Sequence, residues 1–166
     1  MFEEILSAAI AALAQGENRV TRVFPAGPTA FDGRPLVVVG LGGSKLLSSG
    51  LGDYIGVRRE DSGLETEVYG RRLETELRLT VYLPEKDADA ALIESCAGEL
   101  ELLTRSFPAG LRAIEFSRGE ISRDSALRCF VCECLVRCSA YFVAESRDEE
   151  EEFLNFKLRG VFDSAD

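Results

Sequence analysis

The sequence predicts an α+β fold in which a mixed, mainly antiparallel β-sheet carries two helices on one face. Apolar residues recur at helical spacing in two separated segments, one at the N-terminus and one after Pro84. Other segments alternate apolar and polar residues, as half-buried strands do. The connections between these strands are short, which favours long antiparallel hairpins.

The first predicted helix covers residues 2–15. Its apolar stripe follows the spacing of one helix face and consists of Phe2, Ile5, Leu6, Ala9, Ile10 and Leu13. Gly16 is placed as the residue that ends the helix. Glu3 and Glu4 stand where a secretion signal carries Lys or Arg, and no other stretch nears the roughly eighteen apolar residues of a membrane span. We therefore expect a cytoplasmic protein with no membrane segment.

Three strands are predicted in the first half of the chain. Residues 19–24 and 36–39 are short apolar runs bounded by turn residues. Residues 73–83 carry an apolar residue or Thr at every odd position, so one face of this strand belongs to the core and the other to solvent. Before Gly70 the apolar positions are even-numbered. We therefore expect a bulge or a tight turn at Gly70–Arg71.

The second predicted helix follows Pro84, and its stripe consists of Leu92, Cys96, Leu100, Leu103 and Phe107. Pro108 and Gly110 end it. Beyond them the sequence predicts a strand, a polar connection and a long extended segment that bends or projects beyond the domain, at residues 111–116, 117–125 and 127–144 respectively.

The C-terminal part of the chain is predicted to add one more strand to a single domain. We expect residues 1–147 to form the α+β domain, 148–152 to be a connector of five consecutive acids, and 153–166 to form a strand and tail. Apolar residues alternate within 153–162, and that apolar face needs either the sheet or a neighbouring subunit to cover it.

Composition excludes several kinds of function. The 166 residues include 19 Lys and Arg, 29 Asp and Glu, and no His, which gives a net charge of −10. Without His there is no imidazole base, nucleophile partner or metal ligand. The acidic surplus argues against gripping nucleic acid, because that affinity comes from Lys and Arg. Residues 1–83 carry 9 basic and 11 acidic side chains, net −2, and residues 84–166 carry 10 and 18, net −8.

A glycine-rich stretch and four arginines are the first candidates for contacts. Residues 40–56 contain six glycines but match neither a P-loop nor a dinucleotide motif, so we expect a surface loop that orders on a partner. An alternative is a small-molecule site beneath this loop. Arg58-Arg59 and Arg71-Arg72 flank a predicted hairpin tip, where four cations could meet an acidic partner surface.

Four cysteines, Cys129, Cys132, Cys134 and Cys138, form a second candidate cluster. The segment lacks the Gly or Pro of a metal knuckle and is apolar, so we interpret them as buried, reduced core residues on a strand. An intracellular thiol or metal-binding protein that uses this cluster, with Cys96 as a further ligand, remains the alternative function.

The order of the segments resembles a known family. PLVVVGL, LGDYIG, YGRRLETELRLTVYLP, a helix, ISRDSALRCFVCECLVRCSAYF and FLNFKLRG follow one another from about residue 35 to residue 162. In this order they are similar to the tail terminator, or tail completion, proteins of long-tailed phages and prophages. The five cysteines and the acidic connector depart from the simplest pattern of that family.

The resemblance implies a non-enzymatic structural protein without a cofactor or bound metal. It implies a homo-oligomeric ring, a hexamer in most of the family, at the tail-tube end, with tail-tube and head-completion proteins as partners. Such a protein resides in the bacterial cytoplasm or, in an active phage, in the virion tail. The candidate contact residues are Gly42, Gly43, Lys45, Tyr54, Arg58, Arg59, Arg71, Arg72, Phe153 and Phe156.

Overall fold

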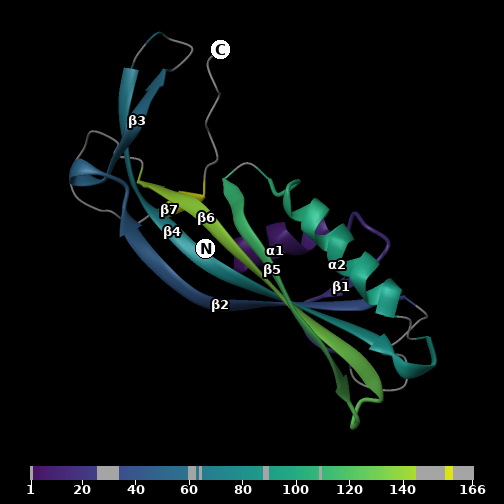
Figure 1. The fold of residues 1–166 in the computed structure, drawn as a ribbon. Helices are drawn as coiled ribbons and strands as arrows, with labels where there is room; N and C mark the ends of the chain where they lie inside the picture. Colours follow the sequence, from purple (N-terminus) through teal and green to yellow (C-terminus); the bar gives the residue numbers. More distant parts are fainter. Residues whose placement is uncertain are drawn as a thin grey trace.

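The computed structural model describes residues 2–25, 34–59, 63, 65–87, 90–108, 110–144 and 156–158. These residues form two α-helices, seven strands and two 3₁₀ turns (Figure 1). The helices are α1 (Phe2–Leu13) and α2 (Ala90–Thr104), and the turns are η1 (Leu51–Asp53) and η2 (Glu85–Asp87). The strands are β1 (Arg19–Thr21), β2 (Leu36–Ser48), β3 (Tyr54–Arg59), β4 (Glu65–Pro84), β5 (Leu111–Asp124), β6 (Cys129–Ala144) and β7 (Phe156–Leu158).

All seven strands belong to one mixed sheet. Its main order is β1-β2-β4-β6-β5, with β3 added to β4 and β7 added to β6. Among the strands of the described residues, β1 and β2 pair in parallel and every other pair is antiparallel. The predicted α+β class, with its mainly antiparallel sheet and long hairpins, is confirmed.

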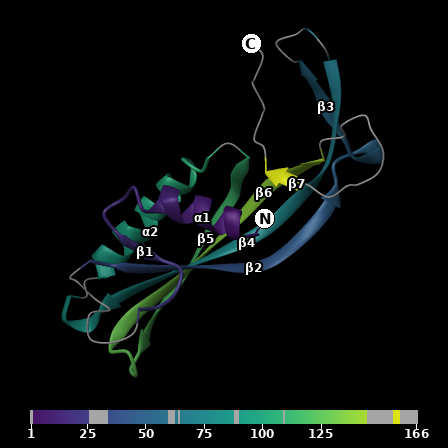
Figure 2. The same cartoon turned by 180° about the vertical axis from the view of Figure 1, so that it is seen from behind.

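Both helices cover the same face of the sheet (Figures 1 and 2). The odd-numbered residues of β4 from Leu73 to Leu83 point toward them and are at most 2% exposed. On β6 the matching buried positions are Cys132, Cys134, Val136, Cys138 and Ala140. Burying an aliphatic side chain of this size contributes roughly 1.5–3 kcal/mol. The apolar face that the alternation predicts for residues 73–83 is therefore the surface on which the helices pack.

The end of α1 is tied to α2 by one carboxylate. The backbone N–H of Glu17 donates to Glu99 Oε1 at 2.9 Å, and the Asn18 side-chain amide donates to Glu99 Oε2 at 2.7 Å. A Cβ at Gly16 would lie 2.1 Å from Glu99 Oε1. The helix ends at Leu13, and Gly16 does not have the positive φ of a helix-ending glycine. This glycine is required for the close approach of Glu99.

The buried stripe of α2 differs by one position from the predicted one. Leu92 is 39% exposed, whereas Ile93 is 2% exposed and belongs to the core. Ile93, Ala97 and Leu100 share a helix face at the i, i+4, i+7 spacing, and Leu92 lies off this face. Cys96 and Leu100 are buried as expected.

The bulge or turn predicted at Gly70–Arg71 is wrong. Strand β4 pairs with β6 from Tyr69 to Pro84 without any shift in register. The odd face of β4 simply passes beyond the helices, so Tyr69 on that face is 39% exposed. The change of apolar parity therefore marks the point on β4 where the helices stop covering the sheet.

Strand β5 is longer than predicted. Residues 117–125 were predicted as a polar connection, but β5 continues to Asp124 and pairs with β6 as far as Cys129. The Asp124 carboxylate then accepts the backbone N–H groups of Ala126 and Leu127 at 2.9 and 3.0 Å, which forms the hairpin turn. The polar composition arises because β5 lies at the outer edge of the described sheet.

The predicted C-terminal strand is present in shorter form. Residues 156–158 pair with residues 142–144 of β6. The predicted acidic connector, residues 148–152, lies outside the described residues. Among the helices of the described residues, none is long and apolar enough to cross a membrane.

Candidate functional site

A long hairpin leaves the helix-covered part of the sheet. Ser48 at the end of β2 pairs with Arg71, and Tyr54 at the start of β3 pairs with Tyr69 two residues further along the same strand. Strands β2 and β3 therefore pair with consecutive parts of the same edge of β4. Figure 1 shows β3 and the facing part of β4 extending past the helices. We call residues 46–59 and 65–73 the hairpin arm.

The glycine-rich stretch is part of strand β2, so its interpretation as a surface loop is wrong for residues 40–48. Leu41 pairs with Leu77 and Ser44 with Thr75, so β2 holds one extra residue at Gly42 and Gly43. This is a β-bulge, which bends a strand and increases its twist. A Cβ at Gly42 would lie 2.6 Å from Glu76 Oε1, whereas a Cβ at Gly43 would meet no atom within 4 Å.

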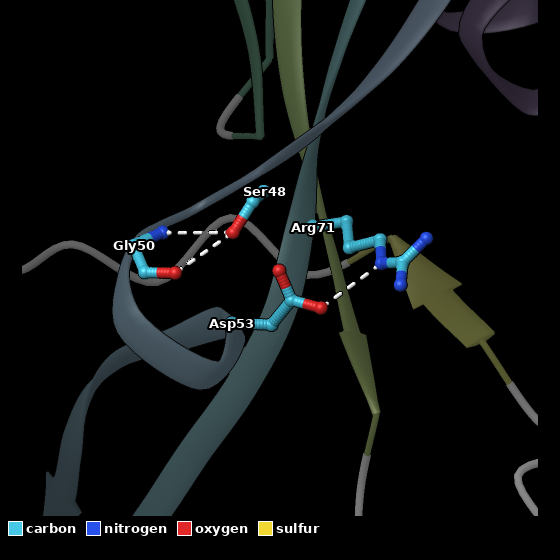
Figure 3. A network of polar contacts seen from close by, with 4 residues as sticks. All are labelled: Ser48, Gly50, Asp53 and Arg71. Carbon is cyan, nitrogen blue, oxygen red and sulfur yellow. Dashed lines mark hydrogen bonds and ion pairs between the residues drawn. The ribbon is translucent and has the colours of Figure 1, made fainter.

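A small polar network holds the junction between β2 and β3 (Figure 3). The Ser48 hydroxyl donates to the Gly50 carbonyl at 2.7 Å, and Arg71 Nε donates to Asp53 Oδ2 at 3.0 Å. The hydrogen bond from Ser48 and the guanidinium of Arg71 lower the pKa of Asp53. Gly52 and Asp53 have φ of 64° and 60°, and the turn requires this left-handed backbone. The network holds the turn in the conformation that lets β3 pair with the edge of β4.

The arm exposes an apolar face. Its large side chains on the helix side of the sheet are Leu46, Tyr54, Val57 and Tyr69, which are 50%, 41%, 52% and 39% exposed. The rings of Tyr54 and Tyr69 pack edge to face with centroids 5.7 Å apart. Clustered apolar exposure of this kind marks an interaction surface, whereas single exposed residues are ordinary. We call these four residues the arm face.

Register places the arm face on one side. Leu46 pairs with Leu73, whose side chain is buried beneath the helices, and Tyr54 pairs with Tyr69. Tyr54 was a predicted contact residue, but Leu46, Val57 and Tyr69 were not. On β4 only Tyr69 continues the odd apolar face past Gly70, because the next odd positions are Glu67 and Glu65, so the sequence pattern did not reveal these three residues.

The two arginine doublets lie apart. Arg58 pairs with Thr66 near the tip of the arm, five residues along β4 from Arg71, a separation of roughly 17 Å. Arg71 contacts Asp53, and Arg72 contacts Glu74 at 3.0 Å. The predicted group of four cations at one hairpin tip does not form, and only Arg58 and Arg59 lie at the tip.

The other predicted contact residues lie elsewhere. Lys45 pairs with Glu74 and so faces the side of the sheet opposite the arm face. Phe156 is the first residue of β7 and pairs with Ala144. Phe153 lies outside the described residues.

The cysteines are core residues in the structure. All five are free thiols in buried positions. Burial raises the pKa of Cys96, Cys134 and Cys138 to about 12 each. Reactive thiols need the opposite shift. Among the described residues, no group of three or more Cys, Asp or Glu side chains is arranged to hold a metal ion.

A search against protein-family models finds no match, and a search of curated proteins finds no similar sequence. The interpretation of the arm therefore depends on its geometry and on the chemistry of its side chains.

Proposed function

We propose that this protein is a non-enzymatic structural component of a phage or prophage tail, which forms a homo-oligomeric ring at the tail-tube end as tail terminator proteins do. The observation that carries this proposal is the hairpin arm. It holds four of the ten large apolar side chains that are exposed among the described residues. An element that extends past its own core with an apolar face is suited to contact another subunit.

A ring follows from the way such an arm is used. When an arm contacts a different surface on the next copy, the contact is heterologous, and repeated contacts close into a ring if the rotation permits. The net charge of −10 suits a channel component that DNA must pass without adhering, since like charges repel the phosphates. These points favour the ring over an isolated monomer.

The alternatives have less support. A thiol or metal-binding role needs reactive sulfur, whereas burial holds the pKa of Cys138 near 12. A small-molecule site beneath a glycine-rich loop needs a loop, whereas residues 40–48 are a strand. We therefore place both below the structural role.

Hydrodynamic mass tests the ring directly. Sedimentation velocity at about 1 to 100 µM, a range that brackets interfaces of ordinary strength, should give a discrete closed oligomer several times the 18.2 kDa of the chain. Negative-stain images of that fraction should contain rings with a central opening. A single 18.2 kDa species at the highest concentration would reject the proposal.

The assignment to a phage tail has a separate test. The genes beside this one should encode capsid, portal and tail-tube proteins. If the protein forms rings but its gene lies among unrelated metabolic genes, the ring stands and the tail assignment fails.

A further inference from the structure

We infer that the ion pair between Asp53 and Arg71 acts as a latch, which keeps strand β3 paired with β4 and so sets the fraction of molecules that present a complete arm face. This inference rests on the proposed ring and names a contact that regulates it. Asp53 and Arg71 act as positioning residues, because neither belongs to the arm face. We call their ion pair the latch.

The outer part of the arm is a ribbon of two strands. Among the described residues, pairing between β4 and β6 ends at Tyr69, so residues 65–68 of β4 pair with β3 alone. None of the six residues of β3 is buried, and Figure 1 shows this strand extending beyond both helices. A two-stranded hairpin is marginally stable in water, because independent stability needs a third strand or a packed face. We therefore expect residues 56–59 and 65–68 to open locally while the core stays folded.

The latch lies where this ribbon joins the rest of the sheet. Asp53 is the residue directly before β3, and its Oδ2 accepts a hydrogen bond from Arg71 Nε at 3.0 Å (Figure 3). Arg71 belongs to a part of β4 that has a neighbouring strand on both edges, since it pairs with Ser48 of β2 and with Phe142 of β6. The latch thus ties the start of β3 to a supported part of the sheet.

The backbone at this junction does not favour the paired arrangement by itself. Asp53 has a φ of 60°, and this left-handed region costs free energy for residues other than glycine. The pairing of β3 with β4 is also irregular between Tyr54 and Gly56, and such an irregularity disrupts the ladder of backbone hydrogen bonds. Side-chain contacts therefore help to hold the first residues of β3. The latch is one of them, and the edge-to-face contact of Tyr54 with Tyr69 is another.

The strength of the latch suits a contact that shifts a population. The side chains of Arg71 and Asp53 are 56% and 28% exposed, so water competes with the ion pair and its contribution to stability is small. A small contribution hardly changes a buried core, but it matters for a ribbon whose open and paired states are close in free energy. Loss of the latch therefore raises the open population of β3 without unfolding the protein.

Opening of β3 removes half of the arm face. Tyr54 and Val57 belong to β3, whereas Leu46 belongs to β2 and Tyr69 to β4. A molecule with β3 open also loses the contact between the two tyrosine rings. Because the complete arm face is the form that binds a neighbour, the apparent affinity of assembly falls with the paired fraction.

Hydrogen–deuterium exchange of the full chain, read by mass spectrometry, measures this opening segment by segment. The latch variants are Asp53→Asn, whose new side chain also tolerates a left-handed backbone, and Arg71→Gln. Each should raise exchange in β3 about two- to fivefold, the range that an exposed ion pair supports, and leave exchange in β6 unchanged. The double variant should add no further increase, because either change alone removes the ion pair. Arg71→Lys keeps the charge, so it should lie between the wild type and Arg71→Gln.

A matched control removes a similar ion pair elsewhere in the sheet. Arg137 lies 3.0 Å from Glu115, and both side chains are exposed. This pair joins β6 to β5, away from the arm. Arg137→Gln should therefore leave both the exchange in β3 and the assembly of the protein as in the wild type.

Sedimentation velocity of the same variants connects the latch with assembly. Asp53→Asn and Arg71→Gln should each raise the Kd of assembly, by up to about fivefold, because the paired fraction of β3 falls. Circular dichroism and the urea midpoint should match those of the wild type, since the core does not depend on the latch.

The outcomes separate this inference from the proposed function. Unchanged exchange in β3, an equal increase in β3 and β6, or additive effects in the double variant would each reject the latch. If β3 opens in the variants but assembly is as strong as in the wild type, the regulatory role is rejected and the ring stands. If the wild type itself is monomeric at about 100 µM, the ring and its regulation are both rejected, whereas the exchange result still decides whether the latch holds β3.

Discussion

Alkaline pH should destabilise the protein through the thiols buried beneath the helices. Burial raises the pKa of Cys96, Cys134 and Cys138 from an ordinary 9.0 to about 12. The folded state therefore keeps these protons at a pH where the unfolded chain releases them. The resulting stability is fully present below about pH 9 and is lost as pH rises toward 12. At about pH 10 the loss is about 1.4 kcal/mol for a thiol that titrates on its own, as Cys138 does.

Cys138→Ala isolates one of these thiols. Burial is the only cause of its raised pKa, whereas Cys134 interacts with Cys132. In urea unfolding under reducing conditions, the variant should lose about 1.4 kcal/mol less than the wild type between about pH 8 and about pH 10. Other titrating groups are present in both proteins and cancel in this difference.

Val136→Ala is the matched control for this experiment. Val136 lies on the same face of β6 and is also fully buried, but it carries no proton to lose. Its substitution should lower stability by a similar amount at every pH. Parallel pH dependences for the wild type and Cys138→Ala would refute the reasoning that this thiol is held protonated.

Three further substitutions test how the fold is held. Glu99→Ala removes the acceptor of the Asn18 side-chain amide and of a backbone N–H, so chemical denaturation should register a loss of about 1–3 kcal/mol. Gly42→Val should cost about 1–3 kcal/mol, because its Cβ would lie 2.6 Å from Glu76 Oε1 and 3.2 Å from Glu76 Cβ, so the Glu76 side chain would have to move. Gly43→Val, where a Cβ meets no atom within 4 Å, should be neutral or stabilising, and an equal loss in both variants would reject the role of Glu76.

The fold class was predictable because the core of this sheet is strictly periodic. Every odd residue from Leu73 to Leu83 is buried, and α1 carries its apolar residues at helical spacing. The cysteines of β6 were also placed correctly, since small apolar residues on a paired strand behave as core residues. These elements can be predicted from the sequence because each of them buries one face in the same core, between the sheet and the helices.

The arm was only partly predictable. Beyond Gly70 no helix covers β4, and its odd positions become Tyr69, Glu67 and Glu65, so the apolar pattern changed where burial ended and suggested a break at Gly70. The glycines of β2 suggested a loop, although Gly42 and Gly43 serve one bulge within a strand. Separation of the arginine doublets depends on pairing between β3 and β4, which local spacing does not reveal.

The central claim is that the hairpin arm joins copies of this chain. Sedimentation velocity of the wild type beside Leu46→Ser with Val57→Ser, at the same concentrations, tests it most directly. The account predicts a discrete oligomer for the wild type and a folded 18.2 kDa monomer for the variant. Identical sedimentation of the two proteins, whether both assemble or both remain monomeric, would contradict it.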